Sequence, residues 1–253
     1  MSLIGKTVVV TRGIKSSSEW TKKLIDIGAN VYNLPTISTS LVELDETLIN
    51  ILKSLTQFDW LVFTSAAGIK YFSILRRRFP LNQSHNKLPA VAVIGDRTEE
   101  AVLESGLKVT FKPTKSDNQH LAQELPLKNN QRVLLLRTTI ASNHLAIALQ
   151  SRGAFVSDAR IYQTNVLTLT DSTFSELLRA NSVDFITFAS PSAVVGFTKR
   201  LGSFELEKAK HLPAVAIGPS VAKKLTHMHF LHVHIADNPS IDGIILKLQQ
   251  LAK

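Results

Sequence analysis

Short runs of apolar, largely β-branched residues alternate along this chain with segments whose apolar residues recur every three or four positions. The run Lys6–Thr11 contains three consecutive valines, and Trp60–Phe63 is apolar throughout. Between them, the apolar residues of 44–55 follow the spacing of one helix face. Buried strands that alternate with amphipathic helices are typical of parallel sheets with helices on both faces. The pattern therefore predicts an α/β fold.

Each half of the chain repeats the same order of elements. We expect strands at Lys6–Thr11, Val31–Leu34, Trp60–Phe63, Ala90–Ile94 and Val109–Phe111, then at Val133–Leu136, Phe155–Tyr162, Phe185–Phe188, Ala214–Ile217 and His232–Ile235. A helical stretch follows most of them. Ligands of such sheets bind beyond the carboxyl ends of the strands, so the residues at strand ends are the first candidates for a site.

An internal repeat indicates that the two halves arose by duplication. Several residues of the first half recur as the same residue type 125 positions later. The pairs are Arg12 and Arg137, Leu24 and Leu149, Gly28 and Gly153, Ala29 and Ala154, Val31 and Val156, Asp59 and Asp184, Phe63 and Phe188, and Ser65 and Ser190. A duplicated unit usually makes two lobes that face each other across a cleft, where we expect the site.

The composition narrows the chemistry. The 253 residues suffice for two cores and include no cysteine, which excludes thiol nucleophiles and cysteine zinc sites and fits a reducing cytosol. No apolar run has the length of a membrane span. The net charge of +9 attracts polyanions, whether nucleic acid, acidic membrane or an acidic small molecule. The absence of Gly-x-Gly-x-x-Gly and Gly-Lys-Ser/Thr loops disfavours a nucleotide cofactor.

Glycines and small hydroxyl residues gather where the predicted strands end and the next helices begin. Free backbone N–H groups and the helix dipole at such positions attract carboxylates or phosphates. The alternative is that each residue only caps its helix. Several such ends in a basic protein favour anion binding. The candidate binding residues are Thr11, Arg12, Thr64, Ser65, Ala66, Gly95, Thr98, Arg137, Ser190, Ser192, Gly218, Pro219 and Ser220.

Tyr162 is the conspicuous proton donor near a strand end, with packing as its alternative role. The histidines of 227–234 span a helix end and a strand, and we expect them to be structural or solvated and not to bind a metal. Arg76–Arg78 follows an apolar helix and indicates its exposed end, because a nucleic-acid arm would need more basic residues and interleaved aromatics.

Short motifs follow one another in a fixed order along nearly the whole chain. They are Val8–Arg12, Leu34–Pro35 with Ile37, Asp59–Ser65, Val93–Gly95 with Thr98, Ile161–Thr164, Phe188–Ser192 and Ala216–Ser220. Each motif is weak alone, but the ordered set resembles the uroporphyrinogen-III synthase family of tetrapyrrole biosynthesis. Val221 and Ala189 stand where the family often has hydroxyl residues, which weakens side-chain roles at those loops and leaves backbone roles intact.

The resemblance implies two similar lobes, each a parallel sheet flanked by helices, with the active site in the cleft. One lobe would consist of residues 1–37 and 168–253, and the inserted lobe of residues 42–162. Residues 38–41 and 163–167 would form a two-stranded hinge. Periodicity alone divides the chain near residue 130 instead.

The resemblance also implies the reaction, in which the linear tetrapyrrole hydroxymethylbilane is cyclised to uroporphyrinogen III with loss of water and inversion of the last pyrrole. Tyr162 would assist departure of the hydroxyl as an acid, and the strand-end groups would hold the substrate carboxylates. The implied enzyme is a cytoplasmic lyase without metal or organic cofactor that binds neither nucleic acid nor membrane. Transient contact with the preceding pathway enzyme fits the same picture.

Two other classes fit the same residues. A two-lobed binding protein for an acidic metabolite needs the strand ends but no proton donor. A basic nucleic-acid binder would carry its charge outside the cleft. An assay of turnover separates the enzyme from the binding protein.

Overall fold

A five-stranded sheet forms the centre of each of the two compact units into which the chain divides. Unit 1 consists of Met1–Ser38 and Asn165–Lys253, and unit 2 of Thr39–Thr164. The computed structural model describes residues 2–79, 88–167 and 172–252, apart from the side chains of 14–17. The predicted start of a lobe at residue 168 lies outside the described residues.

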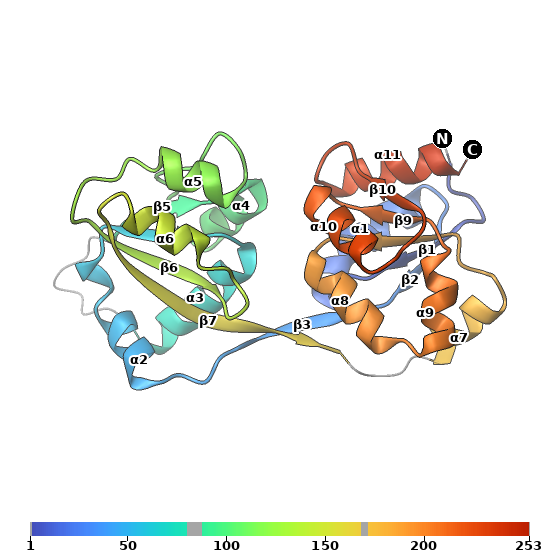
Figure 1. Cartoon of the computed structure of the whole chain (residues 1–253), viewed down its shortest axis with the longest axis horizontal. Coiled ribbons are helices and arrows are strands. Elements are labelled where there is room, and N and C mark those ends of the chain that lie inside the picture. Colours follow the sequence, from blue (N-terminus) through green and yellow to red (C-terminus); the bar gives the residue numbers. More distant parts are fainter. Residues whose placement is uncertain (1, 80–87, 168–171, 253) are drawn as a thin grey trace. The chain divides into compact units, whose positions relative to one another are not determined.

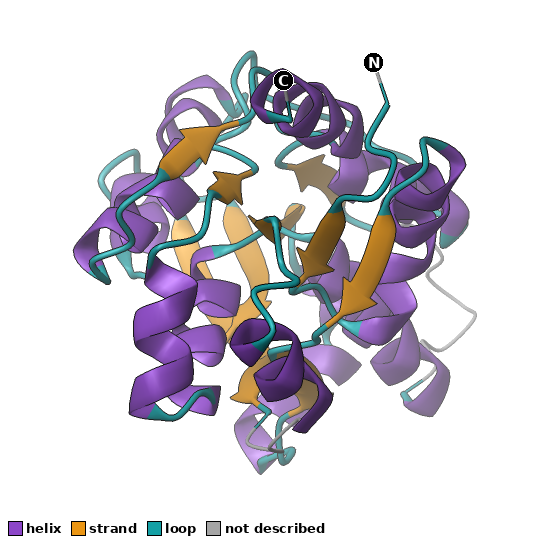
Figure 2. Ribbon diagram, turned by 90° about the vertical axis from the view of Figure 1, so that its right-hand side faces the viewer, coloured by secondary structure: helices purple, strands orange, loops and turns teal. Residues whose placement is uncertain are grey.

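The sheet of unit 1 has the strand order β10-β9-β8-β1-β2, and its neighbouring strands pair in parallel. The strands are β1 (Thr7–Val10), β2 (Asn30–Asn33), β8 (Phe185–Phe188), β9 (Ala214–Ala216) and β10 (Val233–Ile235). The helices are α1 (Ile14–Asp26), α7 (Ser172–Arg179), α8 (Pro191–Arg200), α9 (Ser203–Lys210), α10 (Pro219–His227) and α11 (Ile241–Leu251). Figure 2 faces this unit and shows its strands lying between helices.

Successive residues of each strand in unit 1 pack on opposite faces of the sheet. Val9 packs with Phe197 of α8 and its neighbours, whereas Val8 and Val10 pack with Trp20 of α1 and Ile244 of α11. Both faces are therefore buried, which explains why the central strands are apolar without alternation.

The sheet of unit 2 has the strand order β3-β7-β6-β4-β5 (Figure 1). The strands are β3 (Ile37–Leu41), β4 (Trp60–Phe63), β5 (Ala90–Val93), β6 (Arg132–Thr138) and β7 (Phe155–Val166). The helices are α2 (Glu46–Lys53), α3 (Ala66–Arg78), α4 (Asp96–Glu104), α5 (Asn118–Glu124) and α6 (His144–Gln150), with a short 3₁₀ turn η1 (Leu55–Gln57). One face packs on α2, α3 and α4, and the other on α5 and α6.

The predicted fold class, two α/β parts with parallel sheets flanked by helices, is confirmed. The strand predicted at Val109–Phe111 is wrong, since only an isolated bridge joins Phe111 to Ala92. Pro113 lies two residues after Phe111, and proline cannot donate to a strand ladder. The two strands that the resemblance implied at residues 38–41 and 163–167 correspond to β3 and to the end of β7, which continues past the predicted Tyr162 to Val166.

The duplicated residues Asp59 and Asp184 align the starts of neighbouring strands. Asp59 precedes β4, and its Oδ2 accepts a hydrogen bond from the amide of Arg132 in β6 at 2.7 Å. Asp184 precedes β8, and its Oδ2 accepts one from the amide of Thr7 in β1 at 2.8 Å. Because β4 pairs with β6 and β8 with β1, the repeat in the sequence corresponds to a repeated contact in the structure.

Gly196 lets α8 approach the chain that leads from β2 into β3. A Cβ atom at this position would lie 2.5 Å from the carbonyl oxygen of Thr36 and 2.9 Å from Cγ2 of Ile37. The buried Thr36 hydroxyl donates to the carbonyl of Ala193 in the same helix at 3.0 Å, and the Thr36 carbonyl accepts from the amide of Leu167 at 3.0 Å. Gly196 thus permits the close approach of α8 to Thr36 and Ile37, and the Thr36 carbonyl in turn accepts from Leu167.

Gly196→Ala is expected to destabilise unit 1, although alanine is the better helix former. The gain in helix propensity is about 1 kcal/mol, whereas overpacking costs about 1–3 kcal/mol. The atom that Cβ would meet is backbone and cannot rotate away, so the loss exceeds the gain. Thermal denaturation of Gly196→Ala measures this loss of stability, and Lys199→Ala, at an exposed position of α8, is the control. Equal stability of the two variants would contradict this account.

Candidate functional site

The carboxyl edge of the sheet in unit 2, where β4 and β6 end, brings together two of the predicted site residues. Oη of Tyr162 and Oγ of Ser65 are 2.8 Å apart and share a hydrogen bond. Ser65 is also the N-cap of α3, where its Oγ accepts from the amide of Gly68 at 3.2 Å. The Ser65 hydroxyl therefore caps α3 and shares a hydrogen bond with the Tyr162 phenol.

The Tyr162 ring is held against a second tyrosine that the sequence analysis did not select. Tyr71 of α3 stacks on it with ring centroids 5.4 Å apart and an interplanar angle of 19°. Oη of Tyr71 donates to the carbonyl and, at 2.9 Å, to Oγ1 of Thr39 in β3. In the sequence Tyr71 lies on the apolar face of a helix, where an aromatic residue signals core packing and nothing more.

A β-bulge aims the Tyr162 side chain. Arg137 of β6 lies opposite Arg160, but the next residue, Thr138, lies opposite Tyr162, so β7 contains one extra residue. Regular alternation would send Ile161 and Tyr162 to opposite faces of the sheet, yet both belong to the same core cluster. Bulges of this kind redirect side chains next to functional sites.

Burial raises the pKa of the Tyr162 phenol above its ordinary value, while the hydrogen bond with Ser65 opposes part of this change and the nearby Tyr71 adds slightly to it. Only 6% of the Tyr162 residue is exposed. The phenol is therefore neutral at neutral pH and carries a proton that it can donate.

The other predicted residues of unit 2 lie at the same edge of the sheet but differ in access. Thr64 is half-buried, Ala66 is exposed at the start of α3, and Gly95 precedes α4 with φ of 79°, which favours glycine. Thr98 is buried.

Arg137, one of the candidate binding residues, has a side chain that is already bonded within unit 2. It is 1% exposed, and its Nε and Nη2 donate to the Asp158 carboxylate while its Nη1 donates to the carbonyl of Ser142 at 3.0 Å. The geometry favours a structural role, because a buried charge already satisfied by a carboxylate has no group left to turn outward. The sequence gives no sign of this partner, which is 21 residues away.

In unit 1 the predicted residues follow β1, β8 and β9. The Thr11 hydroxyl is buried and donates to the carbonyl of Thr187 at 2.8 Å. Ser190 is the N-cap of α8, accepting from the amide of Ala193 at 3.1 Å. The guanidinium of Arg12 lies 5.0 Å from the centre of the Trp20 ring. Ser192 lies in the first turn of α8. The remaining residues of this set begin α10, with Gly218 as the N-cap and Pro219 and Ser220 exposed in its first turn.

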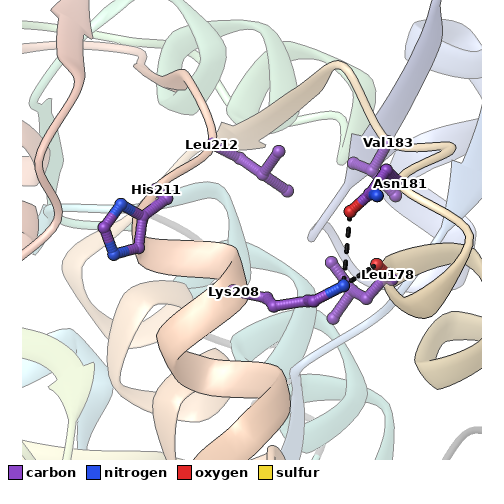
Figure 3. Close-up of a pocket in the computed structure, with 6 residues that line it drawn as sticks. All are labelled: Leu178, Asn181, Val183, Lys208, His211 and Leu212. Atoms are coloured by element: carbon purple, nitrogen blue, oxygen red, sulfur yellow. Dashed lines mark hydrogen bonds between the residues drawn. The ribbon is translucent and has the colours of Figure 1, made fainter.

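A pocket of about 260 Å³ in unit 1 lies at the opposite ends of the strands (Figure 3). Val183 and Leu212 in its lining precede β8 and β9, so the pocket adjoins the amino ends. The Lys208 ammonium in it donates to the carbonyl of Leu178 and to Oδ1 of Asn181, both at 3.2 Å (Figure 3). These contacts satisfy the lysine within the protein, and the pocket is separate from the predicted site.

No group of three or more His, Cys, Asp or Glu side chains in ranges 2–79, 88–167 and 172–252 is arranged to hold a metal ion. Among the helices in this part of the chain, none combines the length and apolarity needed to cross a membrane.

The fold and its strand ends define a duplicated α/β protein with helix-capping hydroxyl groups at the carboxyl edges of its sheets and a neutral, buried phenol at one of them. Comparison with known proteins identifies the family. The family described as "Uroporphyrinogen-III synthase HemD" matches residues 18–245, and the chain belongs to it. The predictions of this family and of its place in tetrapyrrole biosynthesis are confirmed, and they support an enzyme with cyclising lyase activity.

Relatives match over nearly the whole chain. A uroporphyrinogen-III synthase of Synechococcus elongatus is 28% identical, over 99% of this chain and 97% of its own. The porphyrin biosynthesis protein HemD of Ruminiclostridium josui is 27% identical over 98% of this chain, which spans about half (49%) of that relative's length. A crystal structure of a mutant uroporphyrinogen III synthase from Thermus thermophilus has a TM-score of 0.67 at 16% identity, covering 97% of this chain and 98% of that one. It supports the same fold.

The raised pKa of Tyr162 predicts a difference from Tyr162→Phe at alkaline pH. Above the ordinary tyrosine pKa of 10.0 the unfolded chain loses the phenolic proton while the folded chain keeps it. The contribution of Tyr162 to stability is therefore complete below about pH 10 and falls as the pH rises toward the folded-state pKa. Urea unfolding of both proteins from about pH 8 to 11 measures this. A stability difference that stays constant over that range would contradict it.

Proposed function

We propose that this chain cyclises hydroxymethylbilane to uroporphyrinogen III, with loss of water and inversion of the last pyrrole, and that Tyr162 supplies the acid. The observation that carries the proposal is the hydrogen bond between the buried Tyr162 and the half-buried Ser65 at the carboxyl edge of the unit 2 sheet, in a chain of this family. Burial keeps the phenol protonated, and Ser65 fixes its orientation.

The first step is departure of the substrate hydroxyl. Hydroxide is a poor leaving group, so a hydrogen bond or proton from the Tyr162 phenol lowers the barrier. The carbon that is left carries positive charge, which the pyrrole nitrogen stabilises by electron donation. Ring closure then requires the two chain ends to be held in one geometry, a contribution of orientation that can be large.

Binding of the substrate carboxylates is assigned in this proposal to main-chain amides at helix starts, with Arg12 as the charged side chain. Thr64, Ser65, Ala66, Gly95 and Thr98 belong to the proposed set in unit 2. Thr11, Ser190, Ser192, Gly218, Pro219 and Ser220 belong to that in unit 1. Two of them shape the loops and donate nothing to the substrate, because Pro219 has no N–H and the amide and hydroxyl of Thr11 donate to the Thr187 carbonyl. Arg137 takes part only through the backbone around it, because its side chain is bound to Asp158.

The layout expected from the resemblance is part of the proposal, with residues 38–41 and 163–167 as the hinge between a lobe of 1–37 and 168–253 and a lobe of 42–162. We also propose that the enzyme works without metal or organic cofactor, in the cytoplasm, on a small acidic substrate and not on nucleic acid. Contact with the preceding pathway enzyme is proposed as transient. The absence of cysteine supports the reducing compartment.

A binding protein for an acidic metabolite is the second candidate, because helix starts such as those at Ser190 and Gly218 would serve it equally well. It gives the Tyr162 phenol no chemical task. Incubation with freshly made hydroxymethylbilane, followed by separation of the type III and type I isomers, distinguishes the two. Formation of the type I isomer alone, at the rate of spontaneous closure, would favour the binding protein.

Tyr162→Phe is expected to lower the rate of type III formation by about 10²–10⁴-fold, the usual contribution of a positioned acid. The ring and its stacking on Tyr71 remain, so stability near neutral pH should change little. Tyr32→Phe, the same change on β2 in unit 1, is the matched control and should leave turnover intact. A Tyr162→Phe enzyme within a few-fold of the parent would assign the proton to water or to the substrate.

Ser190→Ala and Ser220→Ala should each weaken product binding by less than about 3 kcal/mol, the upper scale of one charge-assisted hydrogen bond. The main-chain amides at these helix starts survive both changes. Ser190→Ala also removes the cap of α8 and should lower stability by about 1 kcal/mol, whereas Ser220, which is exposed in α10, makes no such cap. Isothermal titration with product measures the loss, and a larger one would refute distributed binding.

A further inference from the structure

Arg160 of β7 binds the loop that follows β6 through nearly its whole guanidinium. Its Nη1 lies 3.2, 3.0 and 2.6 Å from the carbonyl oxygens of Thr138, Thr139 and Ala141. Its Nη2 donates to Oδ1 of Asn143 at 2.7 Å. We call residues 138–143, held in this way, the β6 loop. Only the planar fork of arginine can reach so many acceptors at once.

Asp158 holds the guanidinium in place from the other side. Its Oδ2 accepts from Nε of Arg160 at 3.0 Å and from Nη2 at 2.8 Å. The same carboxylate binds Arg137, which reaches the β6 loop at the carbonyl of Ser142. Arg137, Arg160 and Asp158 therefore hold the β6 loop together, and each of these three side chains makes more than one hydrogen bond.

The β6 loop is in turn bonded to Tyr162. The amide of Thr139 donates to the Tyr162 carbonyl at 2.9 Å, just beyond the bulge where Thr138 lies opposite Tyr162. A bulge leaves one residue without a ladder partner and bends its strand. The direction of the next side chain, that of Tyr162, must then depend on contacts outside the ladder. The hydrogen bonds of Arg160 to the β6 loop lie next to this position.

We propose that Arg160 is a positioning residue for Tyr162. It holds the β6 loop and the bulge in the one arrangement that directs the phenol at Ser65. The proposal rests on the proposed role of Tyr162 as the acid. A displacement of about 1 Å is enough to cost about 10²-fold in rate, so the guanidinium affects catalysis without touching substrate. The alternative is that Arg160 stabilises the loop and the Tyr162 orientation is independent of it.

Arg160→Lys is the first test, because lysine keeps the charge and loses the fork. Asp158 retains its bonds to Arg137, so the variant leaves no unpaired buried carboxylate. We expect kcat to fall by about tenfold or more with KM little changed, since the displacement acts on the reacting group. Arg152→Lys is the matched control, because the Arg152 Nη1 also donates to a backbone carbonyl of unit 2, that of Ala122. It should lower stability alone.

Asn143→Ala is the second variant, in case Arg160→Lys fails to fold. It removes one acceptor of the guanidinium and no charge, and Asn143 makes no side-chain cap on α6. A smaller fall in kcat, in the same direction, is expected. Amide hydrogen exchange of Thr139 gives a readout apart from activity, because release of the loop breaks its bond to the Tyr162 carbonyl. Exchange should become faster in both variants and stay unchanged in Arg152→Lys.

A double-mutant cycle with Tyr162→Phe decides between positioning and stability. If Arg160 acts through the phenol, Arg160→Lys lowers kcat in the parent and leaves kcat unchanged in Tyr162→Phe. An equal fall in both backgrounds, or parental kcat in Arg160→Lys, overturns the inference and leaves the role of Tyr162 standing. Parental kcat in Tyr162→Phe itself overturns the role of Tyr162 and with it the inference, whatever the exchange of Thr139 shows.

Discussion

Parallel pairing of strands that are far apart in the sequence is the constraint on which both units depend. The hydrogen bonds between β4 and β6, and between β1 and β8, bring the carboxyl ends of these parallel strands to one edge of each sheet. Asp59 and Asp184 fix the starting points of these pairs by accepting from the first amide of the neighbouring strand. A shift of one residue would move each side chain to the other face, so these carboxylates determine which residues meet at the far end.

The basic residues of the chain contribute more to its internal structure than its net charge of +9 suggests. Arg137, Arg152 and Arg160 each donate to backbone carbonyl groups within unit 2. These carbonyls lie in the β6 loop or, for Ala122, in the last turn of α5, where backbone partners are lacking, and an arginine fork satisfies them at a distance. Part of the positive charge that the sequence analysis assigned to attraction of an anion therefore serves to shape the edge of the sheet.

The features that could be predicted from the sequence are those set by local pattern. Apolar runs located the central strands, and the positions of Ser65 and Ser190 after them predicted helix starts that both serines do cap. The missed features depend on distant partners. The bond between Arg137 and Asp158, the stacking of Tyr71 on Tyr162 and the bulge in β7 each join residues at least 21 positions apart. Nothing in the spacing of either partner marks these contacts.

The bulge in β7 also breaks the equivalence of the two halves. Val10 pairs with Asn33 in one half and Leu135 with Asp158 in the other, the same positions of the repeat. Beyond that point β2 ends at Asn33, whereas β7 continues through the bulge to Val166, and Tyr162 has Ile37 at the corresponding place in the first half. A duplicated gene begins with two copies of every side chain, and a side chain that is found in one half alone marks a place where the copies have diverged. The copy of Tyr162 is an isoleucine, so a protein built from twin halves carries this phenol on one side of its repeat only.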